Sequence, residues 1–416
     1  MAKPTRAPKI LNTALRIVIR GYLTRRFNLT VVGKGIKGID ELKSPYLIVA
    51  NHTNFWDPFF VASFVPKPIH FVTADEYFRN PLVKAALRLV GAIPKSKFIA
   101  DFDTVKSILK VKKAGGIIGV FPEGRRNWDG GPEPVVYSTA KLIKALKLPV
   151  VTALLKGAHL SKPRWAKKPR RGLVSVTYNV LLTPEEIAKF TADEIYKRVV
   201  SGLDYHEYAF QAKEMIRYKG RRLAENLELF LFTCPQCRKI GTMKSERNDF
   251  FCSTCGYHVS YDKYGFFQSR SGDKLSFRNP KEWNQWQLAL LQNQIASAKK
   301  GSPVIFEDRL VFLLQGSRLK PLKKIHTGRL QLPADSLLFT NLQGEKIRFD
   351  FAQISGLNVQ QNDKLEFYYQ NMLYRFIFQP RVSAYKWLKG IELLQVGTGK
   401  PEQNLFPINQ TLSIGT

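Results

Sequence analysis

The sequence predicts a layered α/β domain, then a small cysteine-containing module, then an antiparallel β domain that ends in a helix. Over the first 200 residues, short apolar runs alternate with amphipathic segments. The four cysteines fall in two close pairs beyond the middle of the chain. From residue 302 onward, short runs rich in Val, Ile, Phe and Tyr alternate with turn residues, which is typical of antiparallel strands.

The charge of the chain predicts an anionic partner. The 416 residues carry a formal net charge of +32, which is densest in the first half of the chain. This excess suits a nucleic acid, an acidic protein or an anionic membrane, and charge alone does not choose among them. No apolar run approaches the roughly 18–20 residues that cross a bilayer, so we expect no transmembrane span. Arginines interrupt the apolar N-terminal stretch, so we expect no secretory signal and a reducing, cytosolic setting.

The first predicted elements are an amphipathic helix at 8–26 and a strand at 28–32. The helix mixes arginines with aliphatic residues at helical spacing, so it suits either a membrane surface or packing on its own domain. Three glycines between residues 33 and 38 then have the spacing of a dinucleotide-binding loop. The short, Pro45-broken stretch before the next strand leaves no room for a crossover helix, so we predict no nucleotide site there.

The remaining elements of the first 200 residues alternate between strands and helices. Apolar runs predict strands at 46–50, 116–121 and 149–155, and amphipathic periodicity predicts helices at 81–90 and 141–148. Thr183 and Thr191 each precede a Glu by three residues, which predicts two short helices with capping boxes. A longer helix within 201–231, from about residue 204, is expected to connect the first domain to the cysteine module.

His52 is a catalytic candidate on its chemistry. It follows the predicted strand at 46–50, and Asp57 comes five positions later across a turn. A neutral imidazole can accept a proton from a hydroxyl near pH 7, and a carboxylate on its other nitrogen would fix the tautomer. A turn histidine bonded to the backbone has the same spacing, so the pair needs companions elsewhere in the sequence.

Three sequence strings resemble the 1-acylglycerol-3-phosphate acyltransferase family, also called the lysophospholipid or glycerolipid acyltransferases. The strings are Asn51-His52 with Asp57, then Phe121-Pro122-Glu123-Gly124, then Leu148-Pro149-Val150-Val151. The resemblance covers about residues 25–180 and implies a glycerolipid acyltransferase-type sheet domain over 1–200. It also implies that His52 is the general base and that Asp57 is its partner.

The resemblance further implies an acceptor site and a reaction. Glu123, Gly124 and Arg126 would line the glycerol-phosphate pocket, with Arg125 beside them. A fatty acyl group would pass from acyl-CoA or acyl-carrier protein to the hydroxyl of lysophosphatidic acid or a related lysophospholipid. The sequence has no Gly-x-Ser-x-Gly elbow and no cysteine near His52, so we expect direct attack on the thioester without an organic cofactor.

The sequence departs from the family pattern in two places. The family's Gly-x-Ile-x-x-x-Arg becomes a stretch that ends in Lys97, and lysine keeps the charge but loses the bidentate fork that suits a phosphate. Where the family usually has Glu-Gly-Thr-Arg-Ser, this sequence has Arg125, Arg126 and Asn127 in the last three positions. We predict Lys97 as a substrate-binding residue, and the departures leave the exact acceptor open.

Two Cys-x-x-Cys pairs predict a metal site. Cys234 and Cys237 are separated from Cys252 and Cys255 by fourteen residues, which suits a tetrahedral zinc site with four cysteine ligands. The module over 232–260 is similar to a zinc ribbon. Four cysteine ligands leave no open coordination position, so we predict that the zinc is structural.

The last part of the chain predicts a small β domain at 301–396, reached through a linker with a helix at 261–300. Strands are expected at 336–340, 346–351, 364–369 and 372–378, with a closing helix at 384–394. This order is similar to that of pleckstrin-homology-like or GRAM-like domains. The tail at 397–416 is predicted to be loose.

Residues 162–171 pack six basic residues around Trp165. Such a run is either a solvated surface or a dock for an anionic membrane, where each basic residue contributes about 1 kcal/mol. Because the expected acceptor is a lipid, we predict a peripheral, monotopic protein at the cytoplasmic face of a membrane.

The alternative function is a basic zinc-ribbon protein that binds nucleic acid and has no acyltransferase activity. The charge is densest in the half that contains the family strings, and the β segment lacks an aromatic RNA-binding signature. The enzyme is therefore favoured, and nucleic acid is not expected as a partner.

Overall fold

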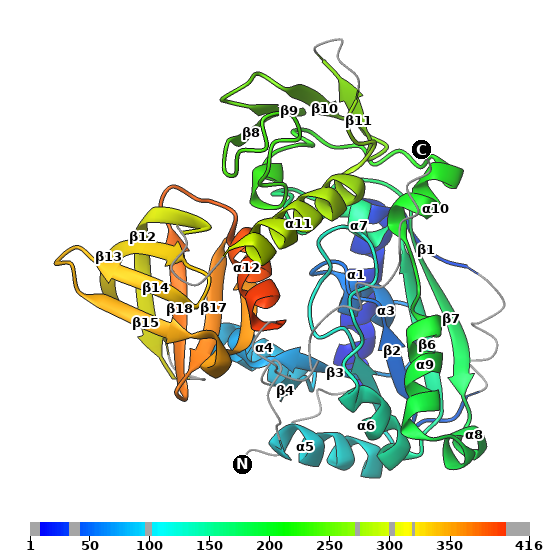
Figure 1. Cartoon of the computed structure of the whole chain (residues 1–416). Helices are drawn as coiled ribbons and strands as arrows, with labels where there is room; N and C mark the ends of the chain where they lie inside the picture. The colour runs from blue at the N-terminus through cyan, green and yellow to red at the C-terminus, as the bar shows by residue number, and fades with distance from the viewer. Residues whose placement is uncertain are drawn as a thin grey trace.

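The computed structural model describes residues 9–32, 42–95, 102–270, 275–298, 304–317 and 321–396. These residues form an α/β domain, a small sheet that carries the cysteines, and a curled antiparallel β sheet (Figure 1). The coarse fold class predicted from the sequence, α/β first and antiparallel β later, is therefore confirmed.

The α/β domain is built on a seven-stranded sheet with the order β1-β7-β6-β2-β5-β3-β4. Neighbouring strands are parallel except β6 and β7, which are antiparallel. The strands are β1 (Leu29–Val31), β2 (Leu47–Ala50), β3 (Ile69–Ala74), β4 (Ile93–Lys95), β5 (Ile117–Val120), β6 (Val150–Lys156) and β7 (Val174–Leu182). Strand β2 lies in the centre, so residues that follow it lie at the carboxyl edge of the parallel strands.

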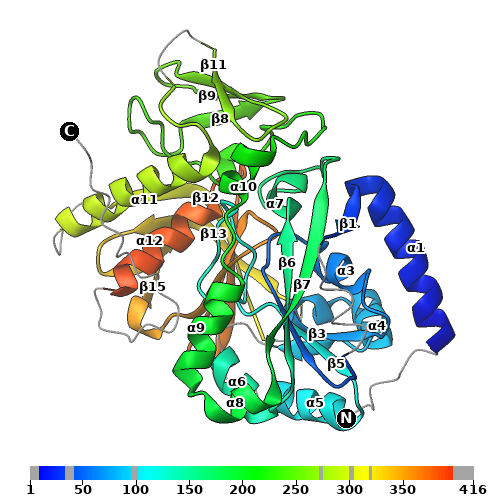
Figure 2. The ribbon, with the colours of Figure 1, turned by 90° about the vertical axis from the view of Figure 1, so that its right-hand side faces the viewer.

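Helices cover both faces of this sheet, as Figure 2 shows. One face packs against α1 (Lys9–Phe27) and α3 (Asp57–Ala62), and the other packs against α5 (Phe102–Lys113), α6 (Ser138–Leu146), α8 (Pro184–Lys189) and α9 (Ala192–Gly202). All four residues of β2 are buried, because alternate side chains enter the two cores. This explains why the central strand is a continuous apolar run rather than an alternating one.

Three short helices complete the domain: the 3-10 helix η1 (Asp75–Arg79), α4 (Pro81–Leu89) and α7 (Ala158–Ser161). The first two lie between β3 and β4. Asn80 caps α4 by accepting from the backbone N–H groups of Leu82 and Val83. Both predicted capping boxes are confirmed: the Thr183 and Thr191 hydroxyl oxygens each accept from the third helical N–H, and the backbone N–H of each Thr donates to the Glu side chain at that position.

The predicted long helix within 201–231 is wrong. Helix α10 (Glu207–Glu214) ends at Met215, which has a left-handed backbone, and only the short 3-10 helix η2 (Leu227–Leu229) follows. Between them the chain makes turns and bonds to a distant loop, since Arg171 and Lys219 exchange backbone hydrogen bonds of 2.8 and 2.7 Å. Tertiary contacts therefore override the helical propensity of this segment.

The cysteine module is a four-stranded antiparallel sheet with the order β11-β10-β9-β8. Its strands are β8 (Met243–Glu246), β9 (Asp249–Cys252), β10 (His258–Tyr261) and β11 (Phe267–Ser269), and α11 (Pro280–Ser297) follows. Trp283 of α11 is fully buried among Phe250, Tyr257 and Phe267 of the module. The helix and the small sheet therefore share one core.

The C-terminal sheet has seven antiparallel strands in the order β15-β14-β13-β12-β18-β17-β16. They are β12 (Phe306–Gly316), β13 (Lys323–Leu332), β14 (Ser336–Asn341), β15 (Lys346–Asp350), β16 (Ser355–Gln360), β17 (Lys364–Tyr369) and β18 (Met372–Phe378), and a 3-10 helix, η3 (Phe351–Gln353), precedes β16. Helix α12 (Ala384–Val396) closes the sheet, with Trp387 and Ile391 fully buried. One continuous hydrophobic core joins this sheet, the cysteine module and α11.

Candidate active site

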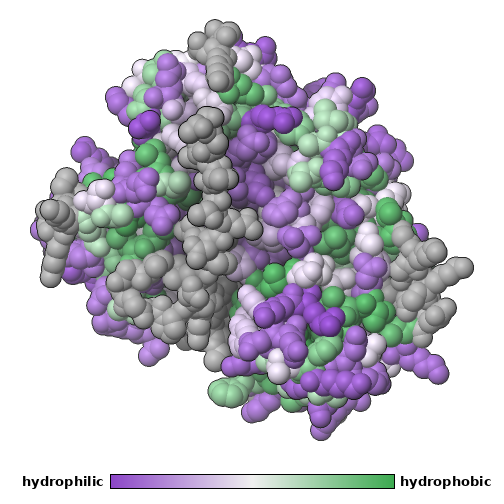
Figure 3. Space-filling model, turned by 45° about the vertical axis from the view of Figure 1, so that its right-hand side comes forward, coloured by the Kyte–Doolittle hydropathy of each residue, from purple (hydrophilic) through white to green (hydrophobic). Residues whose placement is uncertain are grey.

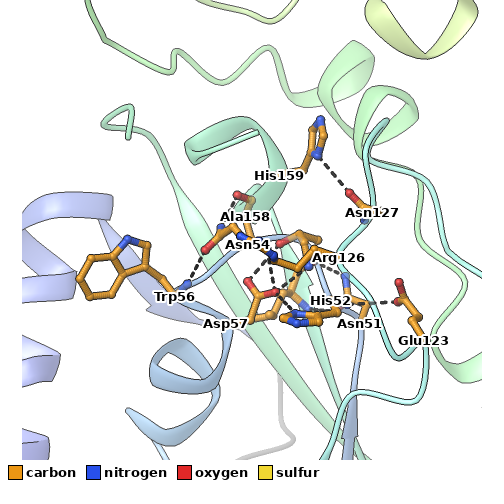
Figure 4. Close-up of polar contacts among 12 residues, drawn as sticks. Asn51, His52, Asn54, Trp56, Asp57, Glu123, Arg126, Asn127, Ala158 and His159 are labelled. Carbon is orange, nitrogen blue, oxygen red and sulfur yellow. Dashed lines mark hydrogen bonds and ion pairs between the residues drawn. The ribbon is translucent and has the colours of Figure 1, made fainter. Parts of the chain in front are cut away.

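His52 and Asp57 face each other just after the central strand β2 (Figure 4). Nδ1 of His52 lies 2.8 Å from Oδ2 of Asp57. The Asp57 carboxylate is fully buried and accepts hydrogen bonds from the backbone N–H groups of Thr53 (2.6 Å) and Asn54 (2.9 Å) and from the Thr53 hydroxyl (3.0 Å). A carboxylate held in this way accepts the Nδ1 proton, which leaves Nε2 as the proton-accepting nitrogen of the ring.

The loop that carries this pair is anchored by two asparagines, to strand β6 and to helix α7. The side chain of Asn51 donates to the carbonyl of Leu155 (3.0 Å) and accepts from its N–H (2.8 Å). The side chain of Asn54 donates to the carbonyl of Ala158 (2.7 Å) and accepts from the N–H of Trp56 (2.7 Å). Both asparagines are buried and satisfied, so they fix the position of His52 relative to the sheet.

Glu123 connects the His52 loop to the segment that contains Glu133. Its carboxylate accepts from the backbone N–H of His52 (3.1 Å) and from that of Glu133 (3.3 Å), and the residue is almost fully buried. Burial, followed by the charge of Glu133, raises the pKa of Glu123 well above its usual value. The side chain therefore positions the histidine loop, and Glu123 is not among the described residues that line the cavity beside His52, so the pocket role implied for it stays a prediction.

Gly124 and the two arginines that follow it have different environments. Gly124 is exposed, has a φ of +67° and lines the large cavity beside His52. The Arg125 guanidinium is buried between Glu133 (2.8 Å) and Glu392 of α12 (2.6 Å), and Arg125 also lines the cavity, so its role in substrate binding stays a prediction. Arg126 is half-buried, and among the described residues its side chain has no carboxylate partner. Lys97 lies outside the described residues.

A cavity of about 1840 Å³ opens beside His52. Its lining is mostly apolar and includes residues of α1, α4, α5, β3 and the edge strand β16 of the C-terminal sheet. Phe121 stacks on the imidazole with a centroid distance of 4.3 Å, and Phe71 stacks on Phe121 at 5.6 Å. The proton-accepting histidine therefore lies at the wall of a space large enough for a long aliphatic chain.

The basic segment at 162–171 is more buried than expected. Arg164, Trp165 and Arg170 are all buried, whereas Lys167, Lys168 and Arg171 are exposed. Arg164 stacks on Trp128 at 4.3 Å and donates to the carbonyl of Val359 in β16 (2.6 Å). Two of the six basic residues of the run are thus buried, and Arg164 connects the α/β domain to the C-terminal sheet.

Sequence reasoning missed Asn54, Arg164 and Glu392 as residues that shape the site. Asn54 lies in the same loop as His52 and Asp57, so a polar side chain two residues from His52 could have indicated a role in the site. The other two are distant in sequence, at 112 and 340 positions from His52. Nothing in a single sequence indicates that such residues meet at one loop.

The four cysteines converge as predicted. Their sulfur atoms all lie within 4.8 Å of one another, with Cys234 and Cys255 at 3.6 Å and Cys237 and Cys252 at 3.7 Å. A tetrahedral zinc with Zn–S bonds of about 2.3 Å requires sulfurs about 3.8 Å apart. Each Cys-x-x-Cys turn is closed in the same way, by Arg238 N–H to Cys234 O (3.0 Å) and by Gly256 N–H to Cys252 O (3.1 Å). These residues fit a structural zinc ion.

Comparisons with known proteins identify the segment that carries the histidine. Residues 29–156 match the acyltransferase family model. The chain is 25% identical over 132 residues to the chloroplastic 1-acyl-sn-glycerol-3-phosphate acyltransferase BAT2 of Brassica napus, which covers 31% of this chain and 38% of that protein. It is also 25% identical over 125 residues to the 1-acyl-sn-glycerol-3-phosphate acyltransferase of Bacillus subtilis, covering 30% of this chain and 62% of that protein.

Each of these two matches spans less than two thirds of the relative's own length. Among solved structures, the 1-acyl-sn-glycerophosphate acyltransferase PlsC from Thermotoga maritima aligns with a TM-score of 0.40 and 20% identity. That alignment covers 48% of this chain and 80% of the other. The cysteine module and the C-terminal sheet lie outside the segment that matches the family model.

Proposed function

We propose that this chain, which has an acyltransferase domain at residues 29–156, transfers a fatty acyl group from a thioester donor to the hydroxyl of lysophosphatidic acid or a related lysophospholipid. The observation that carries the proposal is the 2.8 Å contact between His52 Nδ1 and the buried Asp57 carboxylate, at the wall of a large apolar cavity. The family match and the relatives support the same reaction class.

In this proposal, Nε2 of His52 takes the proton of the lipid hydroxyl while the oxygen attacks the thioester carbonyl. The carbon–sulfur bond then breaks, and the imidazolium returns the proton to the thiolate. The Asp57 carboxylate stabilises the imidazolium and holds the ring in one orientation. The donor is acyl-CoA or acyl-carrier protein, and the acyl chain occupies the apolar cavity.

The test is an acyl-transfer assay on the purified chain with lysophosphatidic acid and each donor in turn. Formation of phosphatidic acid supports the proposal, and its absence with both donors contradicts it. A salt-dependent DNA-binding titration run in parallel tests the alternative function. The comparisons do not favour that alternative, because the relatives named above are acyltransferases.

We also propose that the protein is peripheral and monotopic at the cytoplasmic face of a membrane. Among the described residues, no helix combines the length and apolar character needed to cross a membrane. The face seen in Figure 3 is mostly hydrophilic, with small apolar patches. By contrast, α1, α4 and α5 all border the His52 cavity and expose apolar side chains, including Val18 (69% exposed), Leu82 (83%) and Phe102 (82%).

This membrane proposal predicts that flotation with liposomes depends on exposed apolar and basic side chains. Replacing Leu82 and Phe102 with Gln should reduce binding by about tenfold, because two large apolar side chains lose their insertion into lipid. Replacing the exposed Lys167 and Lys168 with Gln should weaken binding only to anionic vesicles and only at low salt. Binding that ignores both substitutions, lipid charge and salt would contradict the proposal. Arg170 is left intact because it is buried.

We propose that the cysteine module binds one structural zinc ion, as a zinc ribbon does. The module should contain one zinc per chain by metal analysis, and Cys237→Ser should release it and lower the thermal unfolding midpoint. Ser253→Ala, in the other Cys-x-x-Cys turn and with no ligand atom, is the control and should retain the metal. Freshly purified protein without zinc would contradict this prediction.

We further propose that residues 304–396 form a pleckstrin-homology-like domain. The supporting features are the order of its seven strands and the single closing helix α12. The domain boundaries given from the sequence remain predictions.

A further inference from the structure

A second, smaller pocket of about 170 Å³ lies next to the His52 cavity. The two spaces share three lining residues: Phe55, Arg126 and Arg164. The small pocket is also lined by Lys162 and Lys167, and by Arg381 from the segment between β18 and α12. The described residues that line it include five basic side chains and no carboxylate. This composition suits an anion.

Arg381 and Lys167 contribute least to the charge of this pocket. Arg381 forms an ion pair of 2.6 Å with Asp363, and Lys167 is exposed to solvent. Arg126, Lys162 and Arg164 have no carboxylate oxygen within 4.0 Å among the described residues. Three unneutralised cations therefore converge on a space that is only partly open to water.

Arg164 is the most constrained of these cations. It is 4% exposed, and its guanidinium donates to the backbone carbonyls of Arg126 (2.8 Å) and Val359 (2.6 Å), while its Nε has no hydrogen-bond partner. Burial, together with the charge of Arg126, lowers the pKa of Arg164 to about 9, and the same two causes lower the pKa of Lys162. A buried cation without a counter-ion is unfavourable, so a bound anion would relieve this arrangement.

The nearby Arg125 is a buried arginine whose environment differs from that of Arg164. Its guanidinium is also buried, but it is bound by Glu133 and Glu392. At Arg125 the chain itself therefore supplies the neutralising carboxylates. It supplies none, among the described residues, at the pocket beside His52.

We propose that Arg126, Lys162 and Arg164 form a binding site for a phosphate group of one substrate, in a pocket that the C-terminal region completes through Arg381. This inference rests on the proposed function, which supplies two phosphate-bearing substrates. Asn54 and Phe55 of the His52 loop also line the pocket, so a bound phosphate lies beside the catalytic loop. Lys162, Arg164 and Arg381 all lie outside the segment that matches the family model.

Isothermal titration calorimetry tests this site with two soluble probes. Glycerol 3-phosphate represents the head group of the acceptor, and coenzyme A represents the donor. The protein is the full chain with His52→Ala, in which turnover should be slow. Lys162→Gln should weaken binding of the matching probe by about tenfold, and Lys162→Glu should weaken it more, because a phosphate loses a charge-assisted contact. The probe that is affected identifies the substrate.

Lys168→Gln is the matched control, because it removes the same charge from a side chain that is exposed and does not line the pocket. The affinity of the Lys168 variant for both probes should stay within about twofold of that of the parent, since surface charges act weakly at a distance. Equal loss in the Lys162 and Lys168 variants, or no binding of either probe at millimolar concentration, would overturn the site. If the site binds a probe but the wild-type chain transfers no acyl group, the proposed function fails and this inference stands.

Discussion

His52→Ala should lower acyl transfer by about 100- to 10,000-fold while the protein stays folded. The variant removes the proton acceptor, whereas the backbone N–H of residue 52 still donates to Glu123 and its carbonyl still accepts from Asn127. The loop therefore keeps its main anchors. Initial rates with saturating donor and acceptor measure the effect, and the thermal unfolding midpoint checks the fold.

His206→Ala is the matched control for this loss, because His206 is largely exposed and lies outside the cavity. It should retain the wild-type rate. Wild-type turnover in the His52 variant would mean that another group accepts the proton. A low rate accompanied by a large fall in the unfolding midpoint would mean that the residue acts through the fold alone.

The Asp57 side chain makes more hydrogen bonds within the loop than the His52 side chain does, so a variant of Asp57 should behave differently. Its carboxylate accepts three hydrogen bonds besides the one from the imidazole. An amide in Asp57→Asn cannot accept all of them, so this variant should lose both activity and stability. The His52 variant is therefore the cleaner test of the chemistry.

The sequence was most informative where local patterns determine structure. The apolar run of β2, the two capping boxes and the spacing of the four cysteines each depend on residues close together in the chain. The contact between His52 and Asp57 belongs to this group, because five residues suffice to turn the chain back on itself. Such features need little information about the rest of the fold.

The sequence was least informative where distant segments meet. Arg125 and Arg126 are adjacent, yet one is neutralised by Glu392 and the other faces the cavity. Arg170 and the exposed Arg171 are both arginines, but Arg170 is buried and donates to the carbonyl of Leu223 (2.6 Å). The packing of the C-terminal modules on the α/β domain determines these roles. The periodicity of the sequence carries no information about that packing.

The ion pair between Arg125 and Glu392 should be the main electrostatic link between the active-site loop and α12. The two groups lie 2.6 Å apart and are both buried, and Lys389 donates a second contact to Glu392 (2.8 Å). Removing one partner of a buried pair leaves uncompensated charge and costs about 3–5 kcal/mol. Glu392→Ala should therefore lower the free energy of unfolding by about that amount, measured by urea denaturation.

The matched control is Glu225→Ala, which removes a carboxylate from an exposed ion pair with Arg222. That loss should be about 0–1 kcal/mol, because solvent screens surface pairs. Glu392→Ala should also weaken substrate binding, since Arg125 lies between Gly124 and Arg126 of the cavity wall. Equal stability losses in the two variants would show that the buried pair does not couple the domains.

The Glu392 link also predicts a specific pH dependence. Burial opposes ionisation of this carboxyl, but Arg125 and Lys389 outweigh burial and lower its pKa from 4.5 to about 2. A depressed carboxyl pKa gives stability that is complete above the unfolded value and is lost as pH falls through the folded value. The stability difference between wild type and Glu392→Ala should therefore be constant above about pH 5 and should shrink as pH falls from 4.5 toward 2. A difference that grows with acidity would contradict the assigned ion pair, because it would mean that folding raises the pKa of Glu392 above 4.5 instead of lowering it.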